Sequence, residues 1–141
     1  MIVHANLVAL RIDGDWRGVL IEGASGAGKS DLTLRALDAG FRLVADDRTL
    51  LWISDGRLFG RAPEVLSGLL EVRGVGVTAH NPLPFAEVAL AVDCDRAIER
   101  MPEPAEITRL GLAIPSLAIA PLEASAVAKL HLALRHLGGR A

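Results

Sequence analysis

The sequence has a single cysteine, Cys94, and lacks tyrosine and any long uninterrupted hydrophobic run. One cysteine cannot form a disulfide within the chain, so a disulfide framework is excluded and Cys94 is expected to be a structural thiol. The most apolar stretch, residues 110–122, is interrupted by Pro115 and Pro121 and is too short to span a bilayer. The N-terminus carries no signal-peptide pattern, and we expect a cytoplasmic protein with no membrane partner.

An excess of positive charge is also missing. The 15 lysines and arginines are scattered among 17 acidic residues, and the net charge is -2. No basic stripe suits a nucleic acid, so nucleic-acid binding is not expected. The length of 141 residues, 51% of them hydrophobic, predicts one compact domain over residues 1–141.

The first predicted unit is a β-hairpin. Two runs with strand character, residues 7–12 and 17–22, meet at Asp13-Gly14, a dipeptide that favours a two-residue turn. Counting outward from this turn places His4 opposite Gly23. An alternative stays open, in which His4 is a surface histidine near a frayed terminus.

The second predicted unit is a helix followed by a strand. Residues 29–40 have the helical pattern, with Leu34 and Leu37 on one face and Gly40 as the stop, and residues 41–45 form the strand. A right-handed crossover would make this strand parallel to strand 17–22 and bring the following aspartates to the carboxyl edge of the sheet. The pattern predicts an α/β fold.

The rest of the chain is predicted to complete a mixed sheet and to end in a helix. A hairpin is expected with strands at 49–53 and 57–60 around a turn at 54–56. Further strands are expected at 71–77, 88–92 and 113–119. Residues 124–139 predict an amphipathic helix with Val127, Leu130, Leu134 and Leu137 on one face, stopped by two glycines.

A phosphate-binding loop stands between the first hairpin and the first helix. The pattern Gly-x-x-x-x-Gly-Lys-Ser is complete, follows an apolar strand and opens a helix. Its backbone N–H groups can surround phosphate oxygens, its lysine can contact the β and γ phosphates of ATP, and its serine can bind Mg²⁺. The expected ATP-binding residues are Gly23, Ala24, Ser25, Gly26, Ala27, Gly28, Lys29 and Ser30.

Two adjacent aspartates, Asp46 and Asp47, follow the second strand. Consecutive residues at a strand end point to opposite sides, so the two carboxylates can serve different purposes. One can hold Mg²⁺ while the other accepts the proton of an attacking hydroxyl, which a kinase acting on an alcohol needs and an ATPase does not. A helix cap or a solvated strand end is the alternative.

The stretch "LLEVRGVGV" offers a third element. If it is extended, Glu71 and Arg73 point the same way, beside glycines that permit close approach of the backbone. An exposed strand with an ion pair is the alternative, and these residues alone favour that alternative.

Together the segments "GASGAGKSD", "LVADD" and "LEVRGVGV", with His4 upstream, resemble the catalytic domain of the bacterial HPr kinase/phosphorylase family. The resemblance implies a phosphate-loop domain unrelated to eukaryotic protein kinases. It also implies a cytoplasmic serine kinase that uses ATP or pyrophosphate to phosphorylate HPr, the phosphocarrier of the sugar phosphotransferase system. Many members reverse the reaction, and members form hexamers.

Carried over residue by residue, the resemblance gives each site residue a role. Lys29 would contact the γ-phosphate, and Ser30, Asp47 and Glu71 would form the Mg²⁺ shell. Asp46 would be the catalytic base. His4 would lie near the phosphates, and Arg73 would help to order the metal and phosphate side.

The chain departs from the longer members in two respects. It resembles short versions without the separate N-terminal domain, so we expect regulation by that domain to be absent. It has no arginine between Pro115 and Lys129, where longer members carry a basic loop. Two alternatives therefore stay open: a regulatory protein that senses ATP without transferring phosphate, and a small-molecule kinase of the phosphate-loop type. A GTPase is weaker, because no Asn-Lys-x-Asp motif occurs.

Overall fold

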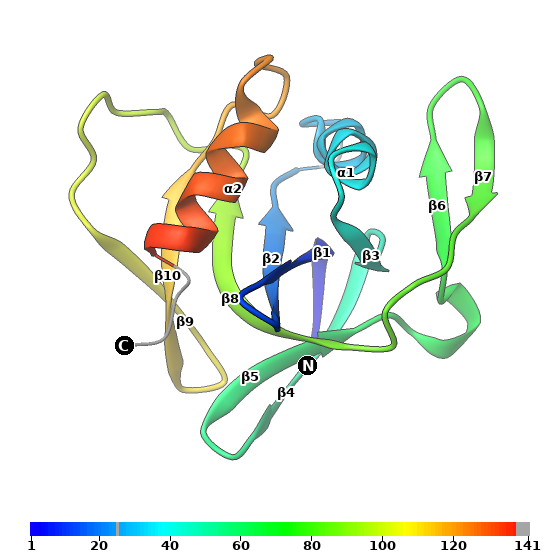
Figure 1. Ribbon diagram of the computed structural model, residues 1–141, viewed down its shortest axis with the longest axis horizontal. Helices are drawn as coiled ribbons and strands as arrows, with labels where there is room; N and C mark the ends of the chain where they lie inside the picture. Colours follow the sequence, from blue (N-terminus) through cyan, green and yellow to red (C-terminus); the bar gives the residue numbers. More distant parts are fainter. Residues whose placement is uncertain (25, 138–141) are drawn as a thin grey trace.

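The computed structural model describes residues 1–24 and 26–137, which form an α/β structure with a mixed sheet (Figure 1). The strands are β1 (Ile2–Ile12), β2 (Asp15–Glu22), β3 (Arg42–Ala45), β4 (Arg48–Ser54), β5 (Arg57–Arg61), β6 (Leu69–Val72), β7 (Gly76–Ala79), β8 (Ala86–Asp93), β9 (Ala105–Arg109) and β10 (Leu112–Ala118). The helices are α1 (Lys29–Asp38) and α2 (Ala126–His136), with a 3₁₀ turn at Glu64–Leu66. The predicted fold class is confirmed.

The first hairpin forms as predicted. Asp13 and Gly14 have φ of 52° and 84°, the left-handed pair that suits the twist of a two-residue hairpin. The β1–β2 register runs without a bulge from Ile12 opposite Asp15 to Ala5 opposite Glu22. His4 and Gly23 are therefore next in line, as the count outward from the turn predicts.

Strand pairings close into a ring. β1 pairs with β2 and β4, β4 pairs with β5, and β5 and β2 both pair with β8. β3 runs antiparallel to β1 and therefore points the same way as β2, which confirms the predicted direction, although β1 lies between them. β8 and β10 are parallel to β2, so the carboxyl ends of these strands share one edge.

Helix α1 ends where the sequence predicts and buries only part of the predicted face. The amide of Gly40 bonds to Leu37 and that of Phe41 to Ala36, which is the hydrogen-bond pattern of a glycine-terminated helix. Leu32, Thr33 and Ala36 are fully buried, whereas Leu34 is 37% exposed. Leu37 is partly buried and packs against the core, so the buried stripe of α1 includes Leu37 but not Leu34.

Two apolar clusters divide the core by the alternation of β1 and β2. Val8, Val19 and Ile21 belong to the cluster that includes residues of α1 and α2, while Leu7 and Leu20 belong to the cluster that includes Leu51 and Leu58 of the β4–β5 hairpin. Both helices lie on the same side of the sheet (Figure 1). Leu130 and Leu134 of α2 are fully buried in the first cluster. The apolar face of α2 therefore serves the core of this chain.

Other parts of the chain also differ from the sequence-based expectations. Residues 71–77 are not one strand, because Gly74 has φ 86° and the chain turns between β6 and β7, which form a separate two-stranded sheet. Strand β9 was not predicted, and it alternates exposed Glu106 and Thr108 with partly buried Ala105 and Ile107 at the sheet margin. Leu137 is 42% exposed, and the predicted stop at Gly138 and Gly139 lies outside the described residues.

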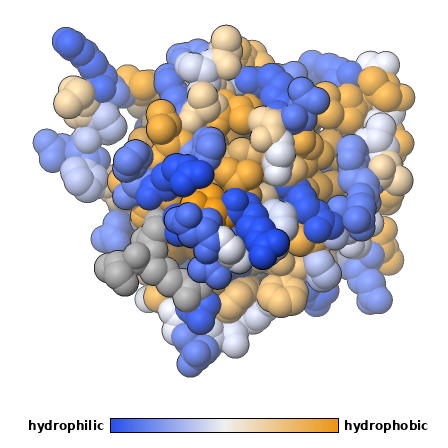
Figure 2. Space-filling view, viewed as in Figure 1, coloured by the Kyte–Doolittle hydropathy of each residue, from blue (hydrophilic) through white to orange (hydrophobic). Residues whose placement is uncertain are grey.

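Hydrophilic and hydrophobic side chains are interspersed on the face shown in Figure 2. Over residues 1–24 and 26–137, neither helix has the length and hydropathy needed to cross a bilayer.

We predict that Gly18→Ala destabilises the fold by about 1–3 kcal/mol, the usual cost of overpacking. A methyl group at residue 18 would lie 2.5 Å from the backbone oxygen of Glu87, where β2 meets β8. Backbone atoms in a parallel pairing cannot move aside as a side-chain end can. Chemical denaturation of both proteins measures the difference, and equal unfolding midpoints would contradict the close β2–β8 approach.

Candidate active site

The glycine-rich loop lies between the carboxyl end of β2 and the first turn of α1. Gly28 has φ 104°, and a side chain there would meet Pro121 and Leu122 at 3.1 Å. Because Gly28 has no side chain to cap the helix, the first N–H groups of α1 remain for an anion. Among the predicted loop residues, Ser25 lies outside the described residues; the others have the expected position at the helix N-terminus.

Lys29 is folded into this loop. Only 8% of the residue is exposed, and Nζ donates to the carbonyl oxygens of Gly23 at 2.6 Å and Ala24 at 3.1 Å. These two bonds hold the ammonium group against the loop that would surround a phosphate. Ser30, the next residue, is exposed on the first turn of α1.

Two acidic residues that the sequence analysis did not single out brace the loop. The Asp95 carboxylate accepts the Ala24 N–H at 2.7 Å, and the Asp93 carboxylate accepts the N–H of Asp95 at 2.8 Å. Asp93 ends β8, which is parallel to β2, so both aspartates reach the same sheet edge. The signal available in the sequence was an acidic pair directly after a buried strand.

Asp46 follows β3 at this edge and is half-buried. Oδ2 accepts the Glu71 N–H at 3.0 Å, while Oδ1 is buried and has no hydrogen-bond partner. Burial raises the pKa of the Asp46 carboxyl above its ordinary value, the charges of Asp47 and Glu71 raise it further, and the Glu71 N–H and the Asn6 amide oppose the rise. A carboxylate whose proton affinity is raised by burial suits a general base.

Asp47 points away from the core and stays 61% exposed in its side chain, with its Oδ1 4.0 Å from Nδ1 of His4. Its φ of 64° is unusual for a residue with a side chain. His4 lines a hollow of about 280 Å³ together with Gly23, Asp93, Asp95 and other residues. The structure thus brings His4 beside both the loop and the aspartate pair.

Glu71 and Arg73 lie on the β6–β7 hairpin. The backbone of Glu71 is tied to Asp46, so its exposed side chain belongs to the same edge. Arg73 sits in the turn after β6 and is exposed. The condition for both side chains to point the same way, one extended strand through both residues, is not met, because β6 ends at Val72.

The carboxylates at this edge fit a magnesium ion. Within the described ranges 1–24 and 26–137, no three His, Cys, Asp or Glu side chains are grouped as a complete metal cage. Mg²⁺ does not need one, since it typically takes one or two carboxylates, water and substrate phosphates. The charges of Asp47 and Glu71 both raise the pKa of Asp46, which indicates a cluster of negative charge. A bound cation would reduce the repulsion within this cluster.

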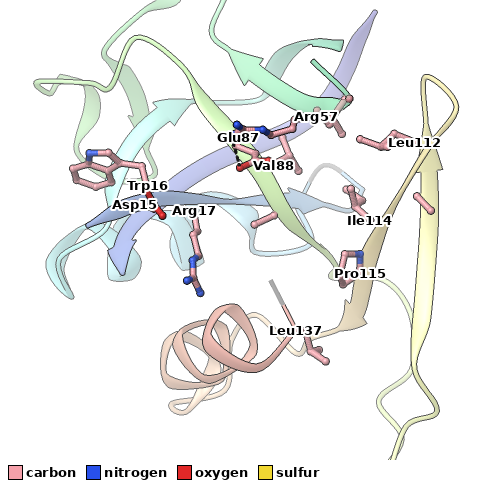
Figure 3. A pocket seen from close by; sticks show the side chains of 14 residues that line it. Asp15, Trp16, Arg17, Arg57, Glu87, Val88, Leu112, Ile114, Pro115 and Leu137 are labelled. Carbon is pink, nitrogen blue, oxygen red and sulfur yellow. Dashed lines mark ion pairs between the residues drawn. The ribbon is translucent and has the colours of Figure 1, made fainter. Parts of the chain in front are cut away.

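A larger hollow, of about 460 Å³, lies at the opposite edge (Figure 3). It is lined by the beginnings of β2, β8 and β10, including Trp16, Glu87 and Ile114. Arg57 pairs there with Glu87 at 3.8 Å, and Arg17 donates to the Leu134 carbonyl oxygen. Ligands of α/β sheets bind at the carboxyl edge, so size does not make this hollow the active site.

Cys94 behaves as the structural thiol expected from the sequence. Burial raises its pKa to about 11, so the thiolate needed for nucleophilic chemistry is disfavoured. A Cβ atom at residue 23 would lie 3.0 Å from the Cβ of Cys94. The segment after β8 therefore packs closely against the start of the loop.

Fold and site together define an α/β protein in which a glycine-rich loop opens a helix and carboxylates gather at the same sheet edge. Residues 2–83 match the family model described as the HPr Serine kinase C-terminal domain. The chain belongs to this family.

Individual relatives agree with this assignment. The chain is 46% identical over 74 residues to an HPr kinase/phosphorylase from Clostridium beijerinckii, a match that covers 52% of this chain and 24% of the relative. It is 52% identical over 61 residues to an HPr kinase/phosphorylase from Streptococcus thermophilus, covering 43% and 20% respectively. The match to the first of these relatives thus spans about a quarter of its length.

A solved structure resembles almost the whole chain. The Hpr(Ser) kinase/phosphatase from Coxiella burnetii superposes with a TM-score of 0.74 at 27% identity, covering 94% of this chain and 96% of that one. The resemblance therefore extends past residue 83 into β8, β10 and α2, beyond the part that the family model matches.

Proposed function

We propose that residues 1–141 form a single phosphate-loop kinase domain, an Mg²⁺-dependent protein serine kinase that uses ATP to phosphorylate an HPr-like phosphocarrier protein. The observation that carries the proposal is the half-buried Asp46 carboxylate, whose pKa is raised by burial and which lies at the same sheet edge as the phosphate loop. Nucleotide hydrolysis alone gives no reason for such a second carboxylate beside Asp47. The names of the relatives support the choice of HPr as the acceptor.

The reaction assigns one task to each side chain. The acceptor serine loses its hydroxyl proton to Asp46 while its oxygen bonds to the γ-phosphorus, and the bond from that phosphorus to the β–γ bridging oxygen breaks, releasing ADP. Lys29 balances negative charge on the β and γ phosphates. His4 lies close enough to the loop and to Asp47 to contact the transferred group. In the reverse direction, protonated Asp46 would return its proton to the serine oxygen.

Ser30, Asp47 and Glu71 would hold the magnesium ion, which when bound neutralises phosphate charge and orients the γ-phosphoryl group. All three are exposed at the edge where the phosphates would lie. Arg73, two residues after Glu71 on the hairpin, would stay on the phosphate side without binding the metal. Assembly into a homo-oligomer would use surfaces other than the apolar face of α2, which is buried within the chain.

We expect the purified protein to transfer labelled γ-phosphate from ATP, with Mg²⁺, to a serine of the HPr-like protein of the same organism. A partner variant with that serine replaced by alanine is the control and should take no label. Phosphoamino-acid analysis identifies the acceptor residue. Label on a residue other than serine, or absence of transfer under conditions in which ATP binds, would overturn the proposal.

A regulatory ATP sensor is the second candidate, and one observation favours it. The segment between β10 and α2 has no basic side chain to meet a protein partner. A basic side chain of α1, Arg35, contacts this segment and donates to the carbonyl oxygens of Pro121 and Glu123. Tight ATP binding without transfer to the HPr-like protein would favour this function over the kinase.

A further inference from the structure

A buried asparagine connects the two halves of the proposed active site. Asn6 of β1 is 1% exposed in an otherwise apolar stretch between Ala5 and Leu7. Its Oδ1 accepts the backbone N–H of Asp47 at 2.8 Å, and its Nδ2 donates to Oγ1 of Thr33 at 2.8 Å. Because buried amides are costly unless hydrogen-bonded, this side chain has a defined orientation.

The connection continues into the phosphate loop. Thr33 is fully buried on α1, and its hydroxyl donates to the carbonyl oxygen of Lys29 at 2.7 Å. Three consecutive hydrogen bonds therefore join the backbone of Asp47 to the backbone of Lys29. Because each hydrogen bond fixes both a distance and a direction, this series fixes the position of Asp47 relative to Lys29.

The turn that receives this support is conformationally unusual. Asp47 has a left-handed φ of 64°, which costs free energy for a residue with a side chain. Its carbonyl oxygen accepts the Ala5 N–H at 3.0 Å, so both of its backbone groups are held by β1. The Asp46 carboxylate precedes this turn and also feels the Asn6 amide.

We infer that Asn6 is a positioning residue that, with Thr33, sets the Asp46–Asp47 turn at a fixed distance from Lys29 and Ser30. The inference deepens the proposed kinase function and rests on it for the roles of these residues. Asn6 touches neither nucleotide nor acceptor in this assignment. It acts through the backbone of Asp47 and through Thr33.

The test compares Asn6→Leu and Thr33→Val, which break the chain at different bonds while keeping side-chain shape. We expect each to lower kcat about 10- to 100-fold, because small displacements of catalytic groups are that costly. The two losses should not add in the double variant, since both break one connection. Thr33→Ser, which keeps the hydroxyl, should lose far less than Thr33→Val.

Thr49→Val is the matched control. Thr49 of β4 is also fully buried, and its hydroxyl donates at 2.9 Å to the carbonyl oxygen of Ala5, the neighbour of Asn6 on β1. The Thr49 hydroxyl bonds neither to the phosphate loop nor to the aspartate turn. The control loses a buried hydrogen bond and therefore stability, as the test variants do. If it also lost kcat to the same extent at equal folded fraction, Asn6 and Thr33 would be structural only.

A binding measurement separates this inference from the proposed function. The ratio of ATP affinities with Mg²⁺ and with EDTA reports how well Asp47 and Ser30 are placed together, without any phosphate transfer. We expect Asn6→Leu and Thr33→Val to reduce this ratio and Thr49→Val to leave it unchanged. An unchanged ratio in both test variants would overturn the inference, whereas a wild-type protein that shows the ratio but labels no HPr would overturn the kinase function alone.

Discussion

Replacing Asp46 by asparagine is expected to lower kcat for phosphate transfer by about 10² to 10⁴, the usual contribution of a general base. Asparagine has nearly the shape of aspartate but cannot take the serine proton. Its side-chain oxygen can still accept the Glu71 N–H that Asp46 Oδ2 accepts now, so the β6–β7 hairpin should stay in place. Steady-state assays with labelled ATP and the HPr-like protein measure the loss.

The same variant provides its own control for folding. Burial raises the pKa of Asp46 above its ordinary value of 3.8, so folding disfavours the charged form. This cost to stability is present when the pH exceeds the raised pKa and disappears as the pH falls below the unfolded-state value. Asp46→Asn should therefore melt at a higher temperature than the wild type at about pH 7, and the difference should close on acidification. Full activity in this more stable variant would remove Asp46 from the mechanism.

Lys29→Met is the second change with a large expected effect. We expect it to lower kcat/KM about 10²- to 10³-fold, which is typical for removing one preorganised donor to developing charge. Methionine can fill the buried channel of the Lys29 stem, but it cannot bond to the Gly23 and Ala24 carbonyl oxygens or meet a phosphate. Initial rates and ATP titrations together separate binding from transfer.

Lys129→Met is the matched control for that change. Lys129 lies on α2 in an exposed ion pair with Glu123 at 2.9 Å, and such pairs contribute little. Its removal should leave transfer at the wild-type rate. Equal losses in the two variants would point to a general need for positive charge, in conflict with the assigned role of the loop lysine.

Local rules in the sequence predicted much of the structure. Asp13-Gly14 dictates a tight turn whatever the rest of the chain does, and it fixed the β1–β2 register as far as Ala5 opposite Glu22. The glycine pattern, with Gly40 ending α1, defined the helix that follows the loop. These features depend on neighbours in sequence, so a single chain without relatives is enough to predict them.

Features that depend on tertiary packing were not predictable in the same way. Residues 71–77 alternate well enough for a strand, but Gly74 allows a turn that separates β6 from β7. The contact of this hairpin with Asp46 is made by the Glu71 N–H on β6. Leu34 fits a helical stripe as well as Leu32 does, and only the position of the sheet decides which is buried. Asn6 carries no local signal beyond being a polar residue within an apolar strand, because its partners lie 27 and 41 positions away.

The parallel pairing of β2 with β8 has a consequence for how the protein is made. It joins residues 18–22 to residues 88–93, and the loop brace from Asp95 to Ala24 lies just beyond it. The β1–β2 hairpin can close early, whereas a contact of such long sequence separation forms slowly and only after its second strand has been synthesised. On the ribosome, the nucleotide loop therefore emerges well before the strand that braces it, and we expect ATP binding to be acquired late, when most of the chain has already been translated.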